Sequence, residues 1–144
     1  MPVILNNQDI TAANPIPVLL VAGVAQVGKV TLSARTPVVD VATGAAAIAK
    51  SSAAHATAFL LHSVTVHLSA APTTSENLTI TLNALAGAAY DTLLSKVNPS
   101  AGALTDIVYL PDLPLLCQAG DVIDVAFANT NTKTYGVRIV TEDV

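Results

Sequence analysis

Two short stretches of the chain, Ser63-Val-Thr-Val-His-Leu-Ser69 and Leu78-Thr-Ile-Thr-Leu-Asn83, alternate apolar and polar residues without a break. Successive side chains of a β-strand point to opposite faces of its sheet, so this alternation puts the apolar residues on one face. The pattern returns at residues 123–127 and 135–139, and shorter candidates lie at 92–97 and 106–110. One buried face and one solvent-facing side is typical of antiparallel sheets.

The candidate strands are separated by clusters of residues that favour turns, at 71–75, 98–102, 119–121 and 129–132. These clusters contain Pro, Gly, Asn, Asp, Ser and Thr, each of which stabilises tight turns. Short strands spaced about 8–14 residues apart indicate a sandwich or a barrel. The sequence therefore predicts an all-β fold: an antiparallel, jelly-roll-like β-sandwich with an extended N-terminal arm.

The first half of the chain is richer in Ala, Pro and Val, and its pattern is less regular. Residues 17–22 and 29–35 are candidate strands, and 37–41 would extend the sheet. Residues 42–58 are mostly Ala with Ser, Thr and Gly. Because Ala favours helix, a short helix near 45–54 is one interpretation, and a small-residue linker is the other. Either would lie within a sandwich domain that spans residues 18–144.

Residues 1–17 have the character of an arm. Met1-Pro-Val-Ile-Leu5 is apolar, the next four residues are polar, and Pro15 and Pro17 discourage a regular helix. A terminal apolar segment without alternation is ordered only when it finds a partner surface, and otherwise it frays. We therefore expect this arm either to contact a partner or to fray.

Composition excludes several classes of protein. The chain has 144 residues, of which 52% are hydrophobic and 11% charged, and its net charge is −4. This length corresponds to about one domain. So few charges exclude a charged disordered tail. Six Lys and Arg against ten Asp and Glu argue against binding to a nucleic acid backbone.

Membrane insertion is not expected either. The longest apolar run, residues 15–25, is interrupted by prolines and a glycine. It is shorter than the ~20 residues that a spanning helix needs. The first basic residue, Lys29, follows this run, whereas a secretory signal carries its basic residues before the apolar stretch.

The sequence contains no convincing set of metal ligands. If residues 62–67 form one regular strand, His62 and His67 point to opposite faces and cannot share a metal ion. Zinc sites need three or four ligands, and Cys117 has no Cys or His near it in the sequence. Cys117 is expected to be a small buried hydrophobe. The polar loop 129–132 lacks the carboxylates that calcium prefers.

Catalytic motifs are also weak. No serine has the flanking glycines of a nucleophile elbow. Asp121 and Asp124 would face opposite sides of a strand, and Asp121 is best interpreted as a turn residue. Gly23, Gly28 and Lys29 have phosphate-loop spacing, but a valine stands where that motif needs Ser or Thr. We expect no enzyme activity, no catalytic residues, no metal and no cofactor.

The second half of the chain resembles a known family. The stretches that carry the resemblance are residues 67–82, 87–94, 119–130 and 135–139. Together they resemble small virion proteins of tailed bacteriophages and prophages, in particular the jelly-roll head decoration (cement) proteins. The resemblance implies a homotrimer on the outer capsid surface, made in the host bacterial cytoplasm and bound to the major capsid protein. It implies no catalytic residues.

The resemblance also gives the arm a role, which is contact with the capsid or with a neighbouring subunit. The residues expected to make this contact are Pro2, Val3, Ile4, Leu5, Ile10, Pro15, Ile16 and Pro17. One alternative is a tail, fibre or baseplate component of the virion. Another is a carbohydrate-binding sandwich, although the chain has no Trp for a sugar platform.

Overall fold

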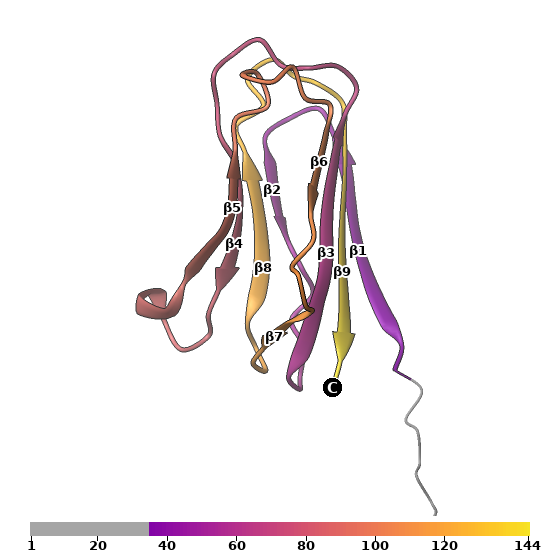
Figure 1. Ribbon diagram of the computed structural model, residues 1–144, viewed down its shortest axis with the longest axis vertical. Helices are drawn as coiled ribbons and strands as arrows, with labels where there is room; N and C mark the ends of the chain where they lie inside the picture. The colour runs from indigo at the N-terminus through magenta and orange to yellow at the C-terminus, as the bar shows by residue number, and fades with distance from the viewer. Residues whose placement is uncertain (1–34) are drawn as a thin grey trace, which may run out of the picture. The chain divides into compact units, whose positions relative to one another are not determined.

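The computed structural model describes residues 35–144, and this part of the chain is a sandwich of two antiparallel sheets (Figure 1). The predicted all-β fold is therefore confirmed. Its only helical element is a single 3-10 turn, η1 (Ala88–Tyr90). The strands, in chain order, are β1 (Pro37–Gly44), β2 (Ile48–Ser51), β3 (Phe59–Leu68), β4 (Leu78–Asn83), β5 (Thr92–Val97), β6 (Asp106–Tyr109), β7 (Leu115–Cys117), β8 (Val122–Phe127) and β9 (Tyr135–Asp143).

The first sheet has the order β1-β9-β3-β6, and the second has the order β2-β8-β4-β5. The short strand β7 continues the line of β6 along the same edge of β3. Asp106–Tyr109 pair with residues 64–67 of β3, and Leu115–Cys117 pair with residues 59–61. Together β6 and β7 therefore act as one interrupted strand.

This strand order is that of a jelly roll. When β6 and β7 are counted together, eight strands remain, and the chain crosses repeatedly from one sheet to the other. A jelly roll is an eight-stranded double sheet built from two Greek keys. In this order β1 and β6 are the edge strands of the first sheet, and β2 and β5 are those of the second; Figure 1 shows β1 and β5 at the two outer sides of the view.

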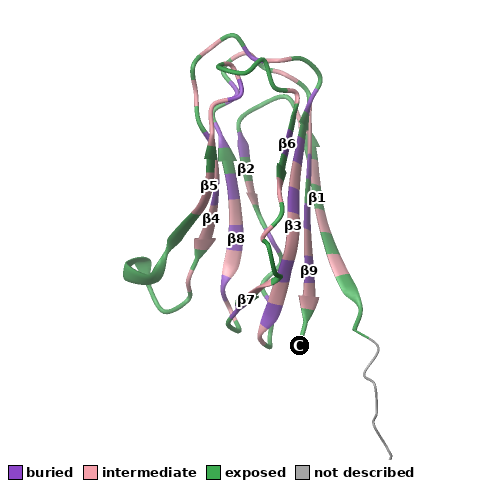
Figure 2. Cartoon of the chain, viewed as in Figure 1, coloured by how far each residue is buried: buried purple, intermediate pink, exposed green. Residues whose placement is uncertain are grey.

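The core lies between the sheets, and alternate residues of nearly every strand point into it (Figure 2). Each predicted apolar face is confirmed, including Val64-Val66-Leu68 and Leu78-Ile80. The core is aliphatic apart from two Phe and one Cys. Its members are Ile48, Phe59, Leu61, Val64, Val66, Leu68, Leu78, Ile80, Ile107, Cys117, Ile123, Val125, Phe127, Val137 and Ile139.

Residues 42–58 differ from both interpretations of the sequence. They are neither a helix nor a plain linker, because 42–44 end β1 and Ile48–Ser51 form β2. Pairing with β8 overrides the helical preference of alanine, since Ile48 fills a core position opposite Phe127. An ion pair between Lys50 and Asp40 (Nζ to Oδ1, 3.6 Å) then links β2 to β1.

The polar loop 129–132 is a structural turn. Asn129 has a φ of 50° and is almost fully buried. Its Nδ2 donates to the carbonyls of Ala45, Ala46 and Lys133 at 2.9–3.0 Å, and its Oδ1 accepts from the Lys133 N–H at 3.0 Å. The side chain thus joins the β8–β9 turn to the β1–β2 turn.

Candidate interaction surface

The outer face of the first sheet is the most distinctive surface of the described chain. We call it the β1–β6 face and define it by the side chains that point away from the core. They are Val39, Val41 and Thr43 of β1; Gly136, Arg138, Val140 and Glu142 of β9; Leu60, His62, Ser63, Thr65 and His67 of β3; and Asp106 and Val108 of β6.

Apolar side chains on this face are open to solvent. Val41 is 64% exposed and Val108 is 58% exposed, at opposite sides of the sheet. An antiparallel sheet normally turns polar residues to water on its outer side. Because valines of β1 and β6 depart from that pattern, this face is a candidate for contact with another molecule.

Two rows of side chains cross the face side by side. One row is Val108, Thr65, Arg138 and Val41, each opposite the next on the neighbouring strand. Arg138 is exposed, and residues 35–144 offer it no ion pair. Arg138 is the one charged residue of this row, so its guanidinium group is available to an acidic group of another molecule.

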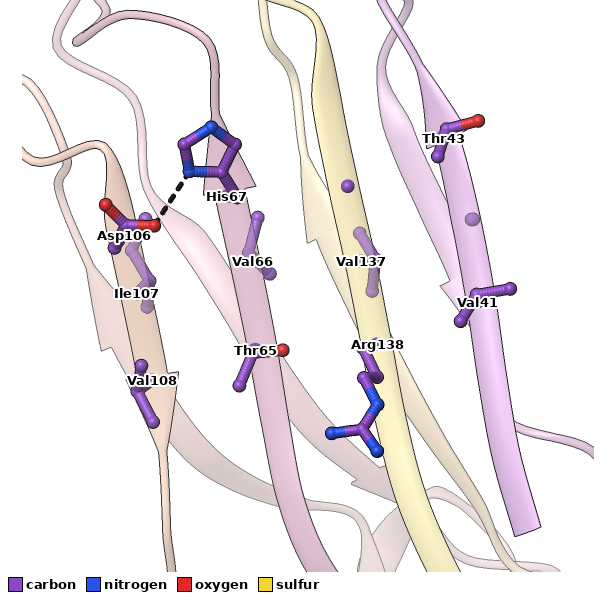
Figure 3. Close-up of a pocket in the computed structure, with 12 residues that line it drawn as sticks. Val41, Thr43, Thr65, Val66, His67, Asp106, Ile107, Val108, Val137 and Arg138 are labelled. Atoms are coloured by element: carbon purple, nitrogen blue, oxygen red, sulfur yellow. Dashed lines mark hydrogen bonds and ion pairs between the residues drawn. The ribbon is translucent and has the colours of Figure 1, made fainter.

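The second row is Asp106, His67, Gly136 and Thr43. Because Gly136 has no side chain, the face is hollowed between β1 and β3, and the hollow has a volume of about 470 Å³. Figure 3 shows the side chains of both rows around it, with His67 and Asp106 at one end and Arg138 at the other.

His67 and Asp106 form an exposed pair, with 2.7 Å between Nδ1 and Oδ1 (Figure 3). The hydrogen bond from His67 holds the pKa of the Asp106 carboxyl below its usual value, and Thr105 contributes through a second bond at 2.9 Å. The pair therefore favours the ionised form of Asp106 under more acidic conditions than those in which an isolated aspartate becomes protonated.

The prediction that His62 and His67 face opposite sides is wrong. The register of β3 against β9 shifts between Leu61 and Ser63, so His62 is the extra residue of a β-bulge. The bulge resets the alternation and turns both histidines to the outer face. His62 Nε2 lies 2.8 Å from Glu142 Oε2, and Arg35 Nε lies 3.5 Å from the other oxygen of that carboxylate.

A second apolar surface lies at the end of the sandwich where β4 connects to β5. Leu85, Tyr90 and Leu93 are exposed there, and so is Leu116 of β7. Tyr90 and Leu116 border a groove of about 420 Å³ that also includes Leu82, Ala84, Ala86, Gln118 and Asp121.

Other residues singled out from the sequence have structural roles. Cys117 is buried as predicted, and burial raises the pKa of its thiol to about 11. Asp121 is confirmed as a turn residue, because its carboxylate accepts the N–H groups of Leu85 (3.0 Å) and Gln118 (2.9 Å). His55, before β3, stacks on Phe59 and pairs with Asp143 at 2.6 Å.

The arm residues predicted to make contacts, the candidate strands at 17–22 and 29–34, and the glycines at 23 and 28 lie outside the described residues. The β1–β6 face was missed from sequence. The available signal was Pro37-Val-Val-Asp-Val41, where apolar residues fall on both faces of the strand.

Across residues 35–144, no three His, Cys, Asp or Glu side chains converge as a metal site would require. No helix in this part of the chain has the length and apolar character to cross a membrane.

No protein-family model matches the chain, and no curated protein matches it. Among solved structures, that of the infectious bursal disease virus Gx strain aligns with 75% of this chain at 12% identity and a TM-score of 0.34. The alignment covers 33% of the viral chain.

Proposed function

We propose that this protein is a structural protein of a virion, a decoration protein that binds the outer lattice of a bacteriophage head and stabilises it. Its partners are the major capsid protein and further copies of itself, arranged as a homotrimer. It works by binding and has no enzyme activity.

The observation that carries this proposal is the β1–β6 face. A sheet that exposes Val39, Val41 and Val108 around a single arginine suits contact with protein surfaces. The low charge of the whole chain, 11%, favours the same kind of partner. Extensive contacts between subunits are what a lattice-binding protein needs.

The jelly-roll strand order adds support by analogy. Jelly rolls occur in viral capsid proteins, lectins and cupins, so the fold is compatible with a virion role without specifying one. The resemblance of residues 67–139 to phage decoration proteins favours the virion among these classes.

In this proposal the N-terminal arm makes the capsid contact. Its apolar residues, such as Ile4 and Leu5, would add to a sheet edge or fill a groove of the capsid protein. The sandwich, with its own core, would then remain on the outside of the shell.

The test is binding of the purified full chain to capsids that lack it, measured by co-sedimentation. We expect the wild-type protein to sediment with the capsids and to raise their thermal stability. The double variant Ile4→Asp/Leu5→Asp should bind weakly, whereas Leu113→Asp, at a 79% exposed site of the sandwich, should bind like the wild type. A wild-type protein that stays in the supernatant would overturn the proposal.

A further inference from the structure

We propose that copies of this chain bind one another through the β1–β6 face, with Arg138 of one copy paired with Asp106 of the next. The inference rests on the proposed function in one respect, namely that the protein self-associates. The inference adds the surface through which the copies associate and the two charged residues that determine how the copies align.

The first argument is the separation of the two charges within one chain. Arg138 lies on β9 and Asp106 on β6, two strands and one row apart. A strand spacing of about 4.8 Å and a rise of about 3.3 Å per residue put their Cα atoms roughly 12 Å apart. Among the described residues Arg138 has no ion pair, and the Asp106 carboxylate, although it accepts from His67 and Thr105, is exposed and can still accept from a partner.

The second argument is that the face complements itself. It carries a cation and an anion at opposite ends of one hollow, with exposed valines on both flanks (Figure 3). A surface that binds its own copy must supply both members of each contact. When two copies pack face to face, with β6 of one copy lying across β1 of the other, Val108 faces Val41, and the side chains of Asp106 and Arg138 approach each other across the interface rather than along one sheet.

The third argument concerns desolvation. An exposed ion pair contributes little to binding, but like charges brought together at an interface cost several kcal/mol. The surrounding valines would exclude water from the pair. The Arg138–Asp106 contact therefore determines which arrangement of copies is allowed, while the exposed valines provide most of the affinity.

Charge reversal of the full-length protein tests the pairing. We compare the wild type with Arg138→Glu, Asp106→Arg and the double variant that carries both changes, by analytical ultracentrifugation. Each single variant should associate at least about tenfold more weakly, because like charges then meet. The double variant should recover most of the association, because opposite charges meet again in the reversed order.

Lys96→Glu is the matched control, because Lys96 is exposed on β5 of the other sheet and should associate like the wild type. Circular dichroism checks that each variant is folded. Three results would overturn the inference: a monomeric wild type, single variants that associate normally, or a double variant no better than the single ones. The first result also contradicts the homotrimer, whereas the other two leave the proposed function standing.

Thiol labelling measures burial of the face directly. Val41→Cys places a reactive thiol on the face, while Cys117 is buried and reacts slowly. Maleimide should label Cys at position 41 more slowly in the wild-type background than in Arg138→Glu. A cysteine at Leu113 should react equally in both, and equal rates at position 41 would contradict the inference.

Discussion

Asn129 is the residue that most clearly joins two distant parts of the chain. Its amide makes four hydrogen bonds to backbone groups of the β1–β2 and β8–β9 turns, and it occupies the left-handed backbone region. Asparagine adopts that region more readily than other non-glycine residues. The same side chain therefore satisfies both the conformation and the hydrogen bonds of the turn.

Replacing Asn129 by Ala should lower the free energy of unfolding by about 3 kcal/mol, because several hydrogen bonds of about 1 kcal/mol each are lost and buried carbonyls are left unpaired. Urea denaturation measures this change. Asn83→Ala is the control: its amide makes one exposed bond to Asp124, so the loss should stay below about 1 kcal/mol. Equal losses in the two variants would contradict this role.

Cys117 gives a prediction for pH. Burial raises the pKa of its thiol to about 11 in the folded protein, above its ordinary value of 9.0. The folded state therefore disfavours the thiolate, and the corresponding stability is present below pH 9 and is lost as the pH rises toward 11. In the Cys117→Ala variant the free energy of unfolding should therefore fall less between pH 9 and pH 11 than in the wild type. Urea denaturation at several pH values in this range measures the difference.

The same pKa predicts slow alkylation. At pH 8 the native thiol should react with iodoacetamide far more slowly than in urea, because the thiolate is the reactive form. Rapid reaction of the native protein at pH 8 would show that the thiol is neither buried nor perturbed.

At the scale of the strand, the bulge in β3 determines what the protein displays. Phe59 and Leu61 point inward before it, and Val64, Val66 and Leu68 point inward after it. In a strand without a bulge, odd-numbered and even-numbered residues point to opposite faces, so the two groups could not all point inward. The extra residue at position 62 allows both groups to reach the core. The sequence carried this signal, since the apolar positions change from odd to even numbers there. The uninterrupted alternation of 63–69 concealed it.

Deleting His62 should therefore be tolerated, because the shortened strand alternates regularly and keeps every core residue inward. Deleting Thr65 should not, because the regular strand that results turns Val64 outward and Ser63 inward. We expect the Thr65 deletion to cost at least about 3 kcal/mol more, from lost apolar burial and a buried hydroxyl. Thermal unfolding of both deletions decides this, and equal stability would contradict the assigned bulge.

Some elements were predictable and others were not, for physical reasons. Long strands with one apolar face, such as β3, β4, β8 and β9, follow directly from alternation. Strands β2 and β7 have only four and three residues, which is too few for a period to appear. Their positions depend on pairing with β8 and β3, and such distant contacts leave no local signal.

At the scale of the whole molecule, the sequence predicts the class of fold but not the order of the strands. Alternation and turn spacing indicate a sandwich, but they do not state which strands pair. The jelly-roll order emerges because β1, β9, β3 and the interrupted strand β6–β7 share one sheet, while β2, β8, β4 and β5 form the other. The apolar β1–β6 face follows from that order, since it brings Val41 and Val108 to opposite sides of one surface.

The proposed role as a head decoration protein is tested most directly by locating the protein in intact particles. Immunogold labelling of virions, with antibodies against the purified chain, gives the position. The proposal predicts label distributed over the outer surface of the head. Label confined to the tail, fibres or baseplate, or particles without label, would contradict it.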